Sequence, residues 1–170
     1  EEKNLDPNAP PTVEFDYAFP SVDDVGDGEE EPEITMLVGF DKKTKAVMAV
    51  YAREKGPKDS YQVDSVKHFF QENAHVQVTA KTDPEPSTVS LMEKVASTRQ
   101  QPMLLRASPK KSKGALGGAE NANKMMESKL RTQNAKVKER LDVRLTKKHV
   151  LTPWAVRHSS WTHNRFQNGE

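Results

Sequence analysis

Cysteine is absent from the 170 residues, which excludes disulfides and thiolate zinc sites. Long apolar runs are absent too, since no stretch approaches the ~20 residues that a helix needs to cross a bilayer. Hydrophobic residues make up only 34% of the chain and the mean hydropathy is −0.84. We therefore expect a modest core under a polar surface, in a nuclear or cytoplasmic protein without membrane contact.

Charge of one sign is not in excess, but the two signs are separated along the chain. The formal net charge is +1. Acidic residues dominate positions 1–33, whereas basic residues outnumber acidic ones over 110–144. This asymmetry favours a polyanionic partner for the basic part, although a charge run is by default a solvated surface.

The hydrophobic periods predict a single α/β domain. Three runs of period two with short connections, at residues 12–19, 34–40 and 46–53, predict an antiparallel meander. Two further strands are then predicted at 75–83 and 101–107. Helices are predicted at 59–72, with Asp59 or Ser60 as the N-cap, between the fourth strand and residue 99, at 120–141 and at 152–166. This order predicts a mixed five-stranded sheet, three antiparallel strands and then parallel additions, flanked by helices on both faces. We expect residues 1–11 to be a linker and 12–170 to be one domain cut from a longer polypeptide.

Three acidic side chains are predicted to meet at one edge of this sheet. Asp83 ends the fourth strand, where open α/β sheets place their chemistry. Asp16 lies between large apolar residues in the first strand, which this topology places beside the fourth. Glu120 is predicted to begin a long helix after a mobile, glycine- and lysine-rich loop at 108–119.

Three gathered acids repel one another unless cations lie among them. Carboxylate oxygens suit Mg²⁺ or Mn²⁺. Two such ions ~3.5–4 Å apart would activate a hydroxyl and stabilise the leaving oxygen of a phosphoryl transfer. Simpler roles stay open at this point: Asp83 could cap the next helix, and Glu120 could be a first-turn acid that favours the helix dipole.

The motifs around these acids resemble those of the catalytic core of retroviral and retrotransposon integrases, which are DDE polynucleotidyl transferases with the ribonuclease H-like fold. Residues 13–17 (VEFDY) resemble the first-strand motif, 81–83 (KTD) the T/S-D turn, and 117–124 (GGAENANK) the G-x-x-E-x-x-N-K signature. The helix at 152–166 carries the N-R pair Asn164-Arg165. The resemblance covers residues 12–170, but Pro84-Glu85 stands where the family usually has Asn-Gly.

The resemblance implies that Asp16, Asp83 and Glu120 are catalytic and hold two Mg²⁺ or Mn²⁺ ions. It also implies DNA strand transfer, in which a 3′-hydroxyl attacks a phosphodiester, and a homo-oligomer acting on DNA. Side chains around this site are predicted to contact the nucleic acid: Lys111, Lys113, Asn123, Lys124 and Arg131. Two alternatives remain, namely a ribonuclease H-like nuclease and a degenerate, transposon-derived nucleic-acid-binding domain without catalysis.

Overall fold

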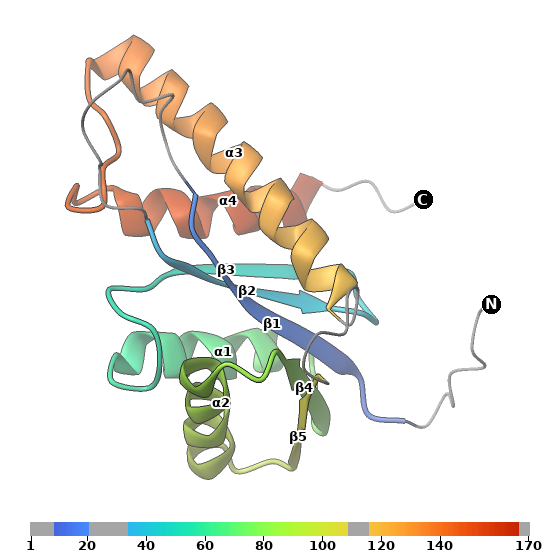
Figure 1. Cartoon of the computed structure of the whole chain (residues 1–170). Coiled ribbons are helices and arrows are strands. Elements are labelled where there is room, and N and C mark those ends of the chain that lie inside the picture. The colour runs from blue at the N-terminus through green and yellow to red at the C-terminus, as the bar shows by residue number, and fades with distance from the viewer. Residues whose placement is uncertain (1–8, 21–33, 109–115, 167–170) are drawn as a thin grey trace.

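The computed structural model describes residues 9–20, 34–108 and 116–166 of the chain. The strands are β1 (Thr12–Ala18), β2 (Met36–Asp41), β3 (Val47–Tyr51), β4 (Val78–Thr82) and β5 (Met103–Ala107). The helices are α1 (Ser60–Glu72), α2 (Pro86–Thr98), α3 (Gly117–Leu141) and α4 (Thr152–Phe166), and Figure 1 shows them around the sheet. None of the helices in these ranges is long and apolar enough to cross a membrane.

The strands form one sheet in the order β3-β2-β1-β4-β5. β2 pairs antiparallel with both β1 and β3, whereas β4 pairs parallel with both β1 and β5. This arrangement confirms the predicted mixed sheet of three antiparallel strands and two parallel additions. β1 is the central strand of the sheet, so its residues have neighbours in both the antiparallel half and the parallel half.

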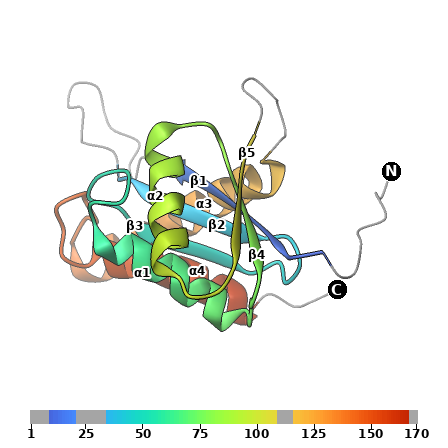
Figure 2. The ribbon, with the colours of Figure 1, turned by 90° about the horizontal axis from the view of Figure 1, so that it is seen from below.

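The side chains of β1 alternate between two cores on opposite faces of the sheet. Val13, Phe15 and Tyr17 pack with apolar side chains of α1 and α2. Ala18 packs on the other face, in a core to which α3 and α4 contribute Ala122, Met126, Leu130, Ala155 and Val156. Figure 2 shows the same layers, with α1 and α2 in front of the sheet and α3 and α4 behind it. Helices cover both faces, as predicted.

The two largest errors in the predicted boundaries are at the starts of β4 and α3. β4 begins at Val78, and Val76 is 70% exposed, because Ala74 and His75 still donate backbone hydrogen bonds to α1. α3 begins at Gly117 and not at Glu120, so the two glycines assigned to a loop form its first turn. The prediction that Asp59 caps α1 is confirmed by its side-chain bond to the next turn. Residues 21–33 and 109–115, which include the rest of the predicted loop, lie outside the described ranges.

The outer edge of β3 is closed by a side chain of α4. Asn164 Oδ1 accepts the Val47 N–H at 2.8 Å, and Asn164 Nδ2 donates to the Val47 carbonyl at 2.8 Å. An edge strand exposes unpaired backbone groups that can recruit other strands. Asn164 therefore takes the place of a neighbouring strand at Val47 and ties the last helix to the sheet.

We expect Asn164→Ala to lower the free energy of unfolding by about 1–3 kcal/mol, because both backbone groups of Val47 lose their partners. Urea denaturation monitored by circular dichroism measures the change. Asn121→Ala is the matched control, since Asn121 is exposed on α3, and a surface change of this kind stays within about 0.5 kcal/mol. Equal effects of the two substitutions would contradict a stabilising role for the edge contact.

Candidate active site at the β1–β4 edge

The parallel pairing of β1 with β4 places Asp16 and Asp83 side by side. Phe15 is the register partner of Thr82, so Asp16 in β1 lies beside Asp83, the residue that directly follows β4. The first turns of α3 lie beside Asp16, since Asn123 Nδ2 donates to Asp16 Oδ2 at 2.9 Å. The predicted position of the first strand next to the fourth is therefore confirmed.

Asp16 is half-buried, and its carboxylate lies close to two other acids. Burial is the main cause that raises its pKa above the ordinary value of an aspartate, and the charges of Asp83 and Glu120 raise it further. Hydrogen bonds from the Tyr17 N–H, at 2.8 Å, and from Asn123 act in the opposite direction without cancelling the rise. The three acids thus share one electrostatic neighbourhood, in which each charge opposes the others.

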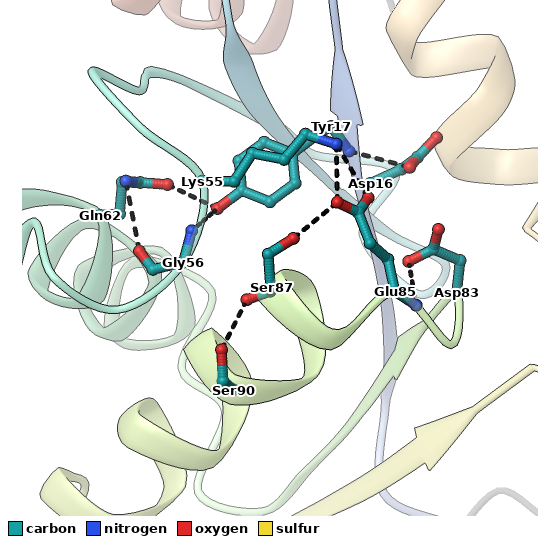
Figure 3. Close-up of polar contacts among 9 residues, drawn as sticks. All are labelled: Asp16, Tyr17, Lys55, Gly56, Gln62, Asp83, Glu85, Ser87 and Ser90. Carbon is teal, nitrogen blue, oxygen red and sulfur yellow. Dashed lines mark hydrogen bonds and ion pairs between the residues drawn. The ribbon is translucent and has the colours of Figure 1, made fainter.

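Asp83 does not cap the helix that follows it. The N-cap residue of α2 is Glu85, which makes no side-chain cap bond, and Pro86 occupies the first turn. Asp83 Oδ1 accepts only a long bond, 3.4 Å, from the Glu85 N–H, as Figure 3 shows. The capping role that the sequence left open is therefore not supported, and the half-buried carboxylate faces the edge that also holds Asp16.

Glu120 lies in the first turn of α3, and its side chain is exposed. Its backbone N–H closes the first helical bond, to the Leu116 carbonyl at 2.9 Å. An exposed glutamate keeps most of its rotamer freedom, so the carboxylate can approach the two aspartates without moving the helix.

The carboxylates of Asp16, Asp83 and Glu120 are donor groups that suit a divalent cation. Three carboxylates supply hard oxygen ligands, and a cation would relieve the repulsion that adds to the effect of burial on the pKa of Asp16. The Oδ1 atom of Asn123, beside Asp16, is buried and has no hydrogen-bond partner in the part of the chain that the structure describes. As the side chains are placed within residues 9–20, 34–108 and 116–166, however, no three His, Cys, Asp or Glu residues form a metal-binding group. A bound ion therefore requires the acidic side chains to reorient.

The charge of Glu85 is neutralised by a residue far away in the sequence. Lys55 Nζ lies 2.7 and 2.9 Å from the two Glu85 carboxylate oxygens, and Ser87 Oγ donates to the same carboxylate at 2.7 Å. Burial alone would raise the pKa of Glu85, but the bonds from Lys55 and Ser87 outweigh burial and lower it. Figure 3 shows Lys55 alongside the ring of Tyr17, 5.4 Å from the ring centroid. The acid in the turn after Asp83 is therefore paired with a cation.

Tyr17 holds the lysine-bearing loop in place. Its hydroxyl accepts the Gly56 N–H at 2.9 Å and donates to Gln62 Oε1 at 2.8 Å. Burial raises the pKa of Tyr17 to about 12, so the hydroxyl stays protonated and keeps both bonds at neutral pH. Nothing in the local sequence marks Lys55 or Gln62 as part of this site, because their partners come from other elements.

The structure describes three of the five residues that are predicted to contact nucleic acid. Lys124 and Arg131 are exposed on α3, on the helix that begins near Glu120. Asn123 donates to Asp16, which gives it a second role that the sequence did not indicate. Lys111 and Lys113 lie outside the described ranges. Contact of these five residues with nucleic acid stays a prediction.

No protein-family model matches the chain, and no curated protein matches its sequence. Solved structures do match its fold. A chain of the simian T-cell lymphotropic virus intasome in complex with PP2A regulatory subunit B56 gamma aligns with a TM-score of 0.66 and 12% identity, over 94% of this chain and 50% of that one. This chain therefore spans about half the length of that chain.

Two integrase catalytic core domains are similar as well. The HTLV-2 core, in complex with magnesium and in dimeric form, has a TM-score of 0.60 and 11% identity, over 94% of this chain and 88% of that one. The BIV integrase core has a TM-score of 0.60 and 12% identity, over 94% and 86% of the two chains. At these identities the likeness concerns the fold. The chain has the ribonuclease H-like fold of retroviral integrase catalytic cores, as the motifs predicted.

We expect Asp16→Asn to stabilise the metal-free protein at neutral pH. The folded pKa of Asp16 is raised, so the folded state gains stability from the protonated acid below about pH 4 and loses it as the pH rises through the folded pKa. The substitution removes that loss, and each 1 kcal/mol of relief raises Tm by roughly 2–4 °C in a domain of this size.

Thermal unfolding with a chelator, at pH 7 and at pH 4, measures this effect. The gain from Asp16→Asn should shrink at pH 4, where the parent acid approaches its neutral form. Asp64→Asn is the control, because Asp64 is an exposed acid of α1 that pairs with Lys67 at 2.9 Å. A lower Tm for Asp16→Asn at pH 7 would mean that the bonds from Tyr17 and Asn123 outweigh the repulsion.

Proposed function

We propose that this chain is the catalytic core of a DDE-type polynucleotidyl transferase and carries out DNA strand transfer. In this reaction a 3′-hydroxyl attacks a target phosphodiester, and the leaving oxygen departs on the opposite side. The proposal depends on one observation: the parallel pairing of β1 with β4 places Asp16 beside Asp83, and the first turns of α3, which carry Glu120, bond to Asp16 through Asn123. The similarity to integrase cores, one of them in complex with magnesium, supports it.

In this proposal Asp16, Asp83 and Glu120 hold two Mg²⁺ or Mn²⁺ ions. When bound, such ions polarise a hydroxyl nucleophile and stabilise charge on the leaving oxygen. Asn123 orients the Asp16 carboxylate through its 2.9 Å bond. Lys55 forms an ion pair with Glu85 and neutralises its charge, so Glu85 does not compete for the cations.

The exposed basic side chains of α3 would hold the DNA backbone. Lys124, Arg131 and Lys138 follow one another at seven-residue steps from a position one turn after Glu120, and all are exposed. Contacts of this type neutralise phosphates and position a duplex without reading its sequence. Lys111 and Lys113 belong to the same proposal, as does a homo-oligomeric state, which sedimentation velocity of the purified chain tests directly.

A second candidate is a nucleic-acid-binding domain that has lost catalysis. The observation that favours it is the engagement of both Asp16 oxygens by amides, together with the lack of a preformed three-acid group within the described ranges. A nuclease of the same fold would use water as the nucleophile in place of a 3′-hydroxyl. The products distinguish the three candidates: joined ends, cleaved strands, or neither.

We expect Mn²⁺ to raise the Tm of the chain, by an amount equivalent to about 2.7 kcal/mol at 100 times Kd, and to support joining of labelled DNA 3′ ends. Asp83→Asn should lose both effects, with strand transfer lowered by roughly 10²-fold or more, because it removes a charge that holds the cation. Glu85→Gln is the matched control in the same turn, and it should retain both effects.

Three outcomes separate the candidates. Joined ends that require Asp83 support strand transfer, whereas cleavage without joining supports the nuclease. If the chain binds DNA but Mn²⁺ does not shift its Tm and no product forms, and if Asp83→Asn changes none of these results, the binding-domain candidate is supported.

We expect Lys124→Ala and Arg131→Ala each to weaken DNA binding and to lower the slope of log Kd against log salt by about 0.9 for each lost phosphate contact. Fluorescence anisotropy with a labelled duplex at several salt concentrations measures the slope. Lys94→Ala is the control, since Lys94 is exposed on α2, on the other face of the sheet. Equal slopes for all three variants would mean that α3 does not contact the DNA.

A further inference from the structure

Glu14 is a buried acid with no role in the carboxylate set. The alternation of β1 directs it to the same face of the sheet as Asp16, where α3 covers it. Its exposure is 1%, which is rare for a charged residue unless the charge is fully paired. Its partners therefore indicate what it does.

The Glu14 carboxylate binds the N-terminus of α3. Oε2 accepts the N–H groups of Gly118 and Ala119 at 3.0 and 3.2 Å, and Oε1 lies 3.4 Å from Lys42 Nζ. The residue before the helix, Leu116, makes no side-chain cap bond. The first-turn amides that a local cap would normally satisfy are thus satisfied by an acid of the central strand.

Gly118 is the residue that makes this contact possible. A Cβ atom at this position would lie 2.4 Å from Phe40 Cδ1 and 2.7 Å from Glu14 Oε2, closer than real Cβ atoms approach. Only glycine lets the helix backbone come this near to β1 and β2. This packing also explains why Gly118 lies in the first turn of a helix and not in a loop.

The contact has a direct consequence for the candidate active site. Glu120 follows Gly118 by two residues on α3, and Asp16 follows Glu14 by two residues on β1. The bond from Asn123 to Asp16 forms a second connection between the same two elements, one turn further along α3. The start of α3 is therefore fixed to β1 at two successive positions, on either side of Glu120.

We propose that Glu14 is a positioning residue, whose buried carboxylate fixes the first turn of α3 on β1 and so places Glu120 beside Asp16 and Asp83. Both Glu14 oxygens are engaged by α3 and Lys42, so Glu14 is not a further member of the carboxylate set. The catalytic part of this inference rests on the proposed strand-transfer function. The anchoring part does not, and it can be measured separately.

The test compares Glu14→Ala and Glu14→Gln with Asp41→Asn. Asp41 is the matched control, because it is a buried carboxylate of β2 that accepts the Lys43 N–H at 2.9 Å and pairs with His75 at 2.6 Å, without any bond to α3 among the contacts described. Glutamine keeps one acceptor oxygen for the α3 amides, whereas alanine keeps none. All three variants remove a buried charge, so a general loss of stability affects them alike.

Two readouts are required. Hydrogen exchange by NMR reports on the Gly118 and Ala119 amides, and single-turnover strand transfer at saturating DNA reports on the placement of Glu120. For Glu14→Ala we expect exchange at these amides to quicken by about tenfold or more, as local opening becomes easier. The transfer rate should fall by roughly 10²-fold, the cost of a displacement near 1 Å, while the Kd for DNA stays within about threefold of the parent.

Glu14→Gln should recover most of the protection and part of the rate, and it remains the informative variant if Glu14→Ala does not fold. Asp41→Asn should lower Tm but leave both readouts unchanged at temperatures where it is folded. Unchanged exchange at Gly118 and Ala119 in a folded Glu14 variant would overturn the anchor. Faster exchange with an unchanged transfer rate would overturn the positioning role and leave the proposed function intact.

Absence of strand transfer by the parent protein would instead contradict the proposed function. The catalytic part of the inference would then fall with it, while the exchange data would still support or overturn the anchor.

Discussion

The parallel pairing of β1 with β4 is the constraint on which the candidate site depends. It brings Asp16 and Asp83, 67 positions apart in the numbering of the chain, to neighbouring strand ends. β1 is central because β2 and β4 pair with its two sides, so its geometry is set by the whole sheet. The two faces are sealed by helices, and this burial supplies most of the free energy that holds the strands in register.

The acids are gathered at a cost to folding stability. Burial and the charges of two neighbours raise the pKa of Asp16, which means that its ionised form opposes folding at neutral pH. Functional sites often contain groups whose repulsion is relieved only by a ligand or a substrate. Asn123 and the Tyr17 N–H moderate the repulsion by binding both oxygens of Asp16. The unpaired Asn123 Oδ1 shows that the polar groups of this site are not fully satisfied in the metal-free arrangement.

The long-range ion pair between Lys55 and Glu85 explains how Glu85 is accommodated near the acids of the candidate site. Glu85 would add a negative charge beside three acids, but Lys55, which lies in the β3–α1 connection, neutralises it. Tyr17 orders that connection through its bond from Gly56 and its contact with the lysine. A substitution in one motif is thus compensated by a residue outside every motif, which only the folded chain brings within 2.7 Å.

The sequence by itself determined the sheet, its central strand and the helices on both faces, because hydrophobic periods and turn residues act locally. Only the tertiary structure decided the environment of each acid. Glu14 has the same alternation as a solvated residue, yet it is buried because the α3 amides that neutralise it come from 104 and 105 residues away. For a similar reason Gly118, which is typical of a loop, lies in the first turn of a helix: its close packing against β1 and Phe40 outweighs its weak intrinsic helix preference.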